Sequence, residues 1–311
     1  MNKALIAIDK SRSFRVYLAI STTMVEDARK VHQTSPLATA ALGRALTGAG
    51  LMGLQLKNEM DKLTVQFKGN GPAGEILVTA NGAGIVKGYI SNPDVELPLK
   101  DNGKLDVGGA LGIGTLTVIK DLGLKEPYVG KIDLVSGEIG EDLTAYFFLS
   151  EQQSSSVALG VRIDTDCTTL SAGGMIIQML PDAKPESVDA LEKLLAEMTS
   201  ISSLIEEVVR QSAGKTEEAI IDSLLARIFE PLPEEFAVEG LEYRELKWVC
   251  DCSVERLEQV VISIGSKDLK EIIEEDENAE LICQFCGTKY QFDKEHLEVL
   301  LKESMQKEGT I

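Results

Sequence analysis

Four of the chain's five cysteines lie near its C-terminal end in two closely spaced pairs. The first pair is Cys250 and Cys252, and the second is Cys283 and Cys286. Four thiolates that converge on one point provide the tetrahedral ligand set that zinc prefers. The same sulfurs, without a metal, are already paired for two short disulfides. The motif therefore predicts a metal site and also a redox switch, and these two interpretations lead to different functions.

Zinc is the metal that this motif favours, because four soft thiolates in a closed site suit it. An iron–sulfur cluster is the alternative, although the cysteines lack the usual cluster spacing. We exclude the two histidines as ligands, since His32 is remote in sequence and His296 lies beyond the usual range of a zinc knuckle. Cys167 has no cysteine or histidine neighbour in sequence, and we interpret it as a passive, half-buried thiol.

The segment that carries the four cysteines is small and poor in apolar residues, so a metal should supply much of its stability. Zinc binding in small thiolate and histidine domains contributes about 10–16 kcal/mol, and its loss is expected to unfold the segment. Thiolates are also the form that reacts with peroxide. A disulfide between Cys250 and Cys252 would close an unusually small ring and should be easy to reduce.

The chain's length and charge limit the classes of function. Its 311 residues allow two or three domains, and its net charge of −19 argues against nucleic-acid binding. From Leu232 onward, 20 acidic residues against 9 basic ones leave a net charge of −11. The sequence shows no secretory signal and no run of eighteen apolar residues, so we expect no membrane span and a cytoplasmic protein with reduced thiols.

Residues 1–180 predict an α+β core domain with a mixed sheet. Helices are expected over 22–30 and 35–56, the second beginning at Ser35-Pro36. Alternating apolar and polar runs separated by glycine-bearing turns predict strands. The strand segments are 14–20, 63–68, 75–79, 85–90, 115–121, 128–133, 142–148 and 175–180. A short helix is expected over 157–161.

A glycine cluster at residues 108–114 has the composition of a phosphate-binding loop. It lacks the Lys-Ser/Thr of a P-loop, and it leads into a strand where a dinucleotide fingerprint would open a helix. We therefore interpret this cluster as turns.

Residues 181–231 predict an amphipathic helical linker. Apolar residues spaced by three and four indicate one long helix over 186–211, and a second helix begins at Thr216. The linker's apolar stripe includes Leu191, Leu195, Met198 and Ile205. In one interpretation the linker is a packed connector. In the other, the stripe is covered only while the linker is docked, so undocking would expose a continuous hydrophobic face.

Residues 232–311 predict a small C-terminal zinc-binding domain. Ser253 begins a helix, and the second cysteine pair lies between two strands with Gly287 in the turn after it. Asp293 begins a final helix.

Two classes of function, an enzyme and a nucleic-acid binder, can be weighed from the residues alone. An enzyme would need a catalytic set, yet no Ser/His/Asp combination can be assembled, and the CxxC pair lacks the strand-to-helix context of a thioredoxin-like site. A zinc-ribbon nucleic-acid binder is disfavoured by the local negative charge. An enzyme predicts turnover with zinc in place, and a nucleic-acid binder predicts salt-sensitive retention of DNA or RNA.

Over its whole length the chain resembles the 33-kDa chaperonin family of bacteria, the redox-regulated heat-shock holdases. The most specific element of the resemblance is the CxC pair followed by the CxxC pair. The segment from Asp164 through Gly173-Gly174 and the helical segment before Pro231 also sit where the family has the end of its core and its linker.

The resemblance implies an ATP-independent chaperone that is not an enzyme. It implies one Zn²⁺ per chain on Cys250, Cys252, Cys283 and Cys286, with the reduced protein folded and inactive. Oxidants, usually with heat, would join Cys250 to Cys252 and Cys283 to Cys286, release zinc and unfold the C-terminal module and linker. The active form would bind unfolding client proteins, typically as a homodimer, with the linker stripe as the candidate client-binding surface.

Overall fold

The computed structural model of the chain describes residues 1–308, and the chain forms two compact units, Met1–Val249 and the residues from Cys250 onward. The α+β class is as predicted. The division between the units differs from the predicted boundary at residue 232. Strand β10 (Val238–Glu245) pairs antiparallel with β1 (Lys3–Asp9), so this segment belongs to the first unit.

A five-stranded antiparallel sheet forms the middle of the first unit. Its strands, in order, are β10, β1, β2 (Phe14–Ile20), β9 (Thr169–Met179) and β8 (Ser155–Ile163). Neighbouring side chains of β2 point into different cores: Val16 and Leu18 face one, whereas Tyr17 and Ala19 face the other. Because successive side chains of a strand point to opposite faces, the sheet is covered on both sides.

A second sheet of six strands lies across a buried helix from the first. Its strands, in order, are β11 (Lys247–Trp248), β5 (Ile85–Ile90), β4 (Glu75–Asn81), β3 (Lys62–Gly69), β6 (Gly114–Asp121) and β7 (Tyr128–Asp133). Helix α2 (Pro36–Gly53) packs on β4 and β5 of this sheet and on β8 and β9 of the other. The Ser35 hydroxyl accepts a hydrogen bond from the N–H of Ala38, which confirms the predicted start of α2.

Three short helices join α2 in the part of the first unit that precedes residue 180. They are α1 (Thr22–His32), α3 (Val107–Leu111) and α4 (Gly140–Leu149). The predicted strand over 142–148 is wrong, because its apolar side chains have helical spacing and Leu143, Tyr146 and Phe147 are buried together. The prediction that the glycine cluster forms turns is only partly right: the cluster forms the short helix α3, then a turn with Gly112 at φ 69°, and then enters β6.

The predicted helix over 157–161 is also wrong. This segment lies within β8, and each of its residues pairs with β9, from Val157 opposite Ile176 to Val161 opposite Ala172. Its apolar residues are not confined to one face, so their spacing does not distinguish a helix from a strand.

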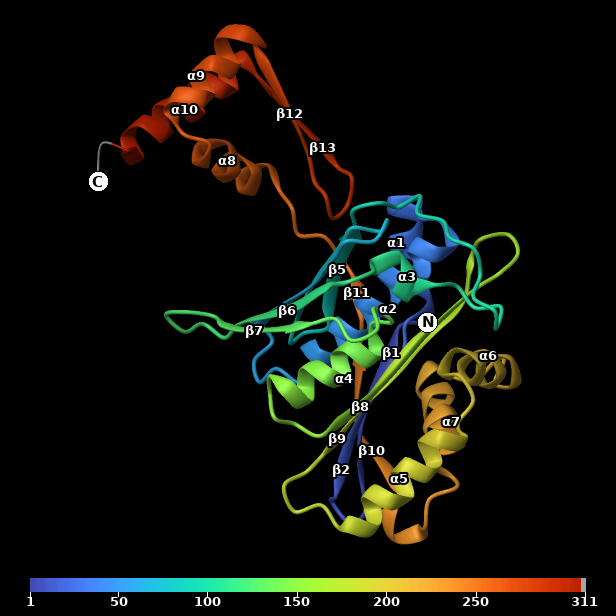
Figure 1. Cartoon of the computed structure of the whole chain (residues 1–311). Helices are drawn as coiled ribbons and strands as arrows, with labels where there is room; N and C mark the ends of the chain where they lie inside the picture. Colours follow the sequence, from blue (N-terminus) through green and yellow to red (C-terminus); the bar gives the residue numbers. More distant parts are fainter. Residues whose placement is uncertain (309–311) are drawn as a thin grey trace. The chain divides into compact units, whose positions relative to one another are not determined.

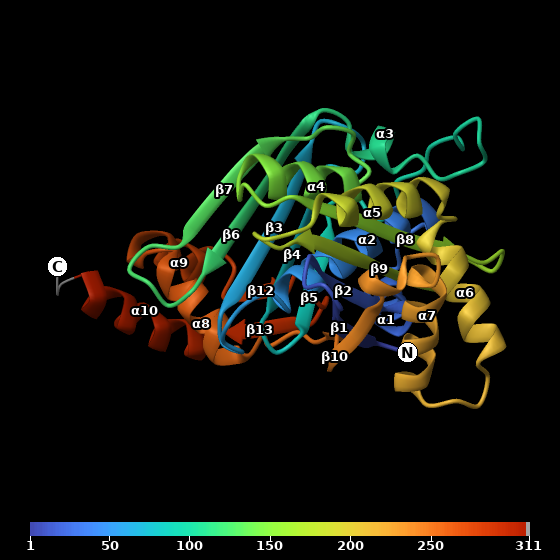
Figure 2. The same cartoon turned by 90° about the horizontal axis from the view of Figure 1, so that it is seen from below.

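Helices α5 (Pro185–Glu197), α6 (Ile201–Gln211) and α7 (Glu217–Phe229) lie together on the face of the first sheet that α2 does not cover (Figures 1 and 2). The single helix predicted over 186–211 is therefore wrong. Met198 is extended, with φ −71° and ψ 131°, and Ser200 caps α6 by accepting a hydrogen bond from the N–H of Ser203. The break turns α6 so that it packs directly on β8 and β9.

Two glycines allow α6 to approach the sheet closely. A Cβ atom at Gly160 would lie 2.9 Å from Ile201 Cγ2, and one at Gly173 would lie 2.5 Å from Ile205 Cδ1. A larger side chain at Gly160 would have to push α6 away, because Ser202 N of its backbone would also lie 2.9 Å from the Cβ, whereas at Gly173 the nearest atom would be the carbonyl oxygen of Ala19 in β2, at 2.3 Å.

The second unit is a small module of three helices and a hairpin. Its elements are α8 (Val254–Ser263), α9 (Ser266–Glu275), β12 (Asn278–Ile282), β13 (Lys289–Asp293) and α10 (Lys294–Glu308). Its buried core consists of Val261, Ile262, Leu269, Ile273, Phe292, Leu297 and Leu300. Across residues 1–308, no helix combines the length and apolar character needed to span a bilayer.

Candidate metal centre

Two turns of the second unit carry the four cysteines. Cys250 and Cys252 precede α8, whose start is capped by Ser253 as predicted. Cys283 and Cys286 lie in the turn between β12 and β13, where the N–H of Gly287 donates to the carbonyl of Cys283 at 2.8 Å. Gly287 has φ 71°, a left-handed conformation that glycine adopts without strain.

The four sulfur atoms converge on one point. All lie within 4.8 Å of one another, with Cys250 Sγ 3.7 Å from Cys283 Sγ and Cys252 Sγ 3.3 Å from Cys286 Sγ. A tetrahedral zinc ion with Zn–S bonds of about 2.3 Å places its sulfurs about 3.8 Å apart. The four cysteines are free thiols, and their arrangement fits a tetrahedral metal ion.

Backbone amides support the sulfurs. The N–H groups of Phe285 and Cys286 donate to the sulfur of Cys283, and the N–H of Cys252 donates to the sulfur of Cys250. Burial nevertheless raises the pKa of both Cys250 and Cys283 in the absence of a cation. A bound cation reverses this effect, because it deprotonates a coordinating thiol.

The thiol of Cys286 is held by hydrogen bonds from the residue that follows the CxxC turn. Although burial acts against ionisation, hydrogen bonds from the hydroxyl and N–H of Thr288 lower the pKa of Cys286 to about 7. The Thr288 hydroxyl lies 3.2 Å from Cys286 Sγ. These hydrogen bonds favour the thiolate of Cys286, the form of a cysteine that binds metal and reacts with oxidants.

Tyr290 is a further residue of the centre, and no sequence motif marks it. Its hydroxyl donates to Cys252 Sγ at 3.1 Å, and this hydrogen bond raises the pKa of Tyr290 to about 12. Partners of this kind orient metal ligands and affect metal affinity. The only sequence signal is its place in the strand after the CxxC turn, which any aromatic residue could occupy.

Neither histidine joins the four cysteines, as the sequence analysis expects. His32 Nε2 lies 2.9 Å from the carbonyl oxygen of Gly88, in the first unit. His296 Nε2 lies 2.8 Å from Glu258 Oε1, and its ring packs on Phe292 with centroids 5.2 Å apart.

Cys167 is exposed, not half-buried. It occupies a turn with φ 66°, in which its N–H donates to the carbonyl of Asp164. A turn that lifts this side chain off the sheet explains why it is not covered.

The predicted linker stripe is covered by the first sheet to different degrees. Leu191 and Ile205 are buried, whereas Leu195 and Met198 are partly buried against the same cluster. Met198 is at the break between α5 and α6, so the stripe is carried by two helices.

Comparisons of the chain with known proteins all identify the same family. A family model described as "Hsp33 protein" matches residues 2–293. The "33 kDa chaperonin" of Alkaliphilus oremlandii (strain OhILAs) is 49% identical over 302 residues, which is 97% of this chain and 96% of that protein. The "33 kDa chaperonin" of Clostridium tetani (strain Massachusetts / E88) is 46% identical over 307 residues, 97% of this chain and 98% of its relative.

A crystal structure of the 33 kDa chaperonin (heat shock protein 33 homolog) from Thermotoga maritima has a similar fold. It matches with a TM-score of 0.84 at 35% sequence identity, and the match covers 98% of this chain and 99% of that one.

Proposed function

The chain belongs to the Hsp33 family of chaperones, and from this we propose that it is a redox-regulated, ATP-independent holdase. In the reduced form Cys250, Cys252, Cys283 and Cys286 bind one Zn²⁺, and the protein is inactive. The observation that carries the proposal is the convergence of four free sulfurs within 4.8 Å in a small unit.

Zinc binding supplies folding energy that the second unit lacks. Its core holds seven buried apolar residues, and a single core in so small a module rarely contributes more than about 3–5 kcal/mol. Zinc sites in small domains supply about 10–16 kcal/mol. Loss of the thiolate ligands therefore unfolds the unit.

Oxidation removes those ligands. Each disulfide forms when two thiolates give up two electrons, and one hydrogen peroxide takes them with two protons to become two waters. Two peroxides convert all four thiolates into two disulfides, which no longer bind zinc.

The pairing of the sulfurs decides whether the second unit comes apart. A disulfide from Cys250 to Cys283 would join the two turns and stabilise the unit, since cross-links across long loops restrict the unfolded chain. Disulfides from Cys250 to Cys252 and from Cys283 to Cys286 leave the two turns independent. The family resemblance implies these two local disulfides, and we propose that the switch uses them.

The linker supplies the hydrophobic surface for clients. Helices α5, α6 and α7 cover one face of the first sheet with residues such as Leu191 and Ile205. Their release would expose both the helix faces and the sheet beneath them, and exposed apolar surface of that extent binds unfolding proteins. The active form is a cytoplasmic homodimer that binds client proteins, and it requires neither nucleic acid nor membrane.

A paired assay on the purified chain tests the proposal. A chromogenic chelator follows zinc release, and suppression of aggregation of a heat-unfolding enzyme follows holding, before and after warm peroxide. One zinc per chain released together with new holding activity supports the switch, and peptide mapping identifies the disulfides. Zinc release without new holding contradicts it, because the metal site would then be only structural.

A further inference from the structure

A cavity of about 350 Å³ lies in the first unit, between the loop before α3, strand β8 and the start of α6. Its lining includes Arg44, Lys104 and Arg162, and among the described residues it includes no acidic one. The whole chain has 50 acidic residues against 31 basic ones, so the cavity departs from the general charge of the protein. Two of the three cations are ion-paired with carboxylates outside the lining, Arg44 with Glu138 and Arg162 with Glu206, so Lys104 carries the uncompensated positive charge.

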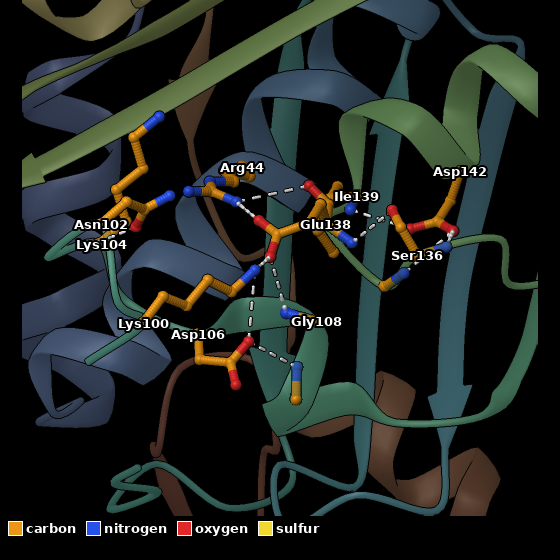
Figure 3. A network of polar contacts seen from close by, with 12 residues as sticks. Arg44, Lys100, Asn102, Lys104, Asp106, Gly108, Ser136, Glu138, Ile139 and Asp142 are labelled. Carbon is orange, nitrogen blue, oxygen red and sulfur yellow. Dashed lines mark hydrogen bonds and ion pairs between the residues drawn. The ribbon is translucent and has the colours of Figure 1, made fainter. Parts of the chain in front are cut away.

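Arg44, which lines this cavity, retains hydrogen-bonding capacity. Its Nη1 lies 2.6 Å from Glu138 Oε2, but its buried Nε has no hydrogen-bond partner among residues 1–308. Figure 3 shows Asn102 and Lys104 on the side of Arg44 opposite to Glu138. Glu138 is shared, since it also accepts from Lys100 and from the N–H of Gly108. One carboxylate therefore does not use all five donors of the Arg44 guanidinium.

The other two cations of the lining lie on different elements. Lys104 ends a turn that is closed by the N–H of Gly103 donating to the carbonyl of Lys100 at 2.8 Å. Its ammonium forms no ion pair within the described part of the chain. Arg162 of β8 lies 2.6 Å from Glu206 of α6 and is 49% exposed, so its guanidinium also has donors free for a ligand.

The start of α6 adds a positive dipole and the strands add an apolar wall. Ser200, Ser202 and Ser203 line the cavity at the first turn of α6, where backbone N–H groups favour an anion. The apolar lining residues are Leu105, Leu159, Val161 and Ile163. Cavities of about 300 Å³ or more hold small organic ligands, with a few polar groups fixing their orientation.

We propose that this cavity binds a phosphorylated small molecule, with its phosphate between Arg44, Lys104 and Arg162 and its organic part against the apolar wall. Because both β8 and α6 line the cavity, a bound ligand links the linker helix to the sheet. This regulatory consequence rests on the proposed function: the ligand would keep the linker docked and raise the threshold for activation.

Calorimetric titration of the reduced, metal-loaded full chain tests the binding, with phenyl phosphate and inorganic phosphate as probes. We expect phenyl phosphate to bind more tightly, with an affinity that falls as salt rises. Lys104→Glu should weaken binding by about tenfold or more, because it places a carboxylate beside the phosphate. Lys125→Glu is the matched control, since Lys125 is exposed and outside the cavity lining.

Three results would overturn the site: no binding of either probe at millimolar concentration, equal loss in both lysine variants, or unchanged binding by Lys104→Glu. Hydrogen exchange over residues 201–211 then tests the regulatory consequence, which predicts slower exchange with phenyl phosphate present. Unchanged exchange despite binding would contradict that consequence alone. Failure of the holding assay would contradict the proposed function and leave the titration result standing.

Discussion

Replacing Gly160 by alanine is expected to loosen helix α6 from the first sheet. The new Cβ atom would lie 2.9 Å from Ile201 Cγ2, Ser202 Cβ and Ser202 N. Since favourable carbon contacts begin near 3.5 Å, α6 must move by about half an ångström or more. Overpacking of this kind costs about 1–3 kcal/mol. If only the docked state of α6 is destabilised by this amount, the undocked fraction of α6 rises by about 5- to 150-fold.

Hydrogen exchange measured by mass spectrometry over residues 201–211 of the reduced, metal-loaded protein reports this change. Exchange should be faster in Gly160→Ala, and the variant should begin to hold clients at a lower temperature after oxidation. Gly140→Ala is the matched control, because its Cβ would meet the same strand at 3.3 Å, at the carbonyl oxygen of Val157. If α6 exchanges equally slowly in Gly160→Ala and in the parent, the close approach does not limit docking and the reasoning fails.

Four other substitutions test the remaining features. Cys250→Ser should sharply reduce the zinc content, and full zinc retention would contradict the assignment of Cys250 as a ligand. Cys167→Ser should leave redox activation intact, and loss of activation would contradict the assignment of Cys167 as a bystander. Tyr290→Phe should weaken metal affinity by about tenfold in chelator competition, and an unchanged affinity would show that its hydroxyl is dispensable. The pKa of Glu26 is lowered from an ordinary value near 4.5 to about 2, and the largest cause is its hydrogen bond to Arg29. This stabilisation is complete above pH 4.5 and is lost as the pH falls toward 2. The measurement is urea unfolding followed by the fluorescence of the single tryptophan, which lies in the first unit. As the pH is lowered, the free energy of unfolding should fall less in Glu26→Gln than in the parent protein. Equal falls in the two proteins would refute the assignment.

The cysteine centre is predictable because the spacing within each pair is local. A CxC and a CxxC pair place two sulfurs each in a single turn, and only the meeting of the turns needs the fold. Tyr290 is different, because its role depends on a contact to Cys252 from another turn. No local pattern marks a tyrosine in a strand as a partner of a thiolate.

Strand β10 shows why the domain boundary could not be placed from sequence. It is an edge strand with mostly exposed residues, so it lacks the alternation of apolar and polar side chains that indicates a strand. Its partner β1 lies at the opposite end of the chain, with Asp9 opposite Val238 and Lys3 opposite Glu245. Such pairing follows from the tertiary fold and not from any local preference.

The close packing of α6 on the first sheet also could not be predicted from the sequence. Glycine within a strand indicates a bulge or a close approach of another segment, but it does not identify that segment. Only the fold shows that Gly160 and Gly173 both lie beneath α6.

The pairing of β10 with β1 has a consequence for what happens after release. The segment 180–237, which carries α5, α6 and α7, begins after β9 and ends before β10, so both of its ends remain in the same sheet. These two strands are three positions apart, or about 14 Å at the usual strand spacing. The released segment is thus a loop fixed at both ends and not a free tail. Its return is intramolecular, at an effective concentration that dilution of the protein does not lower.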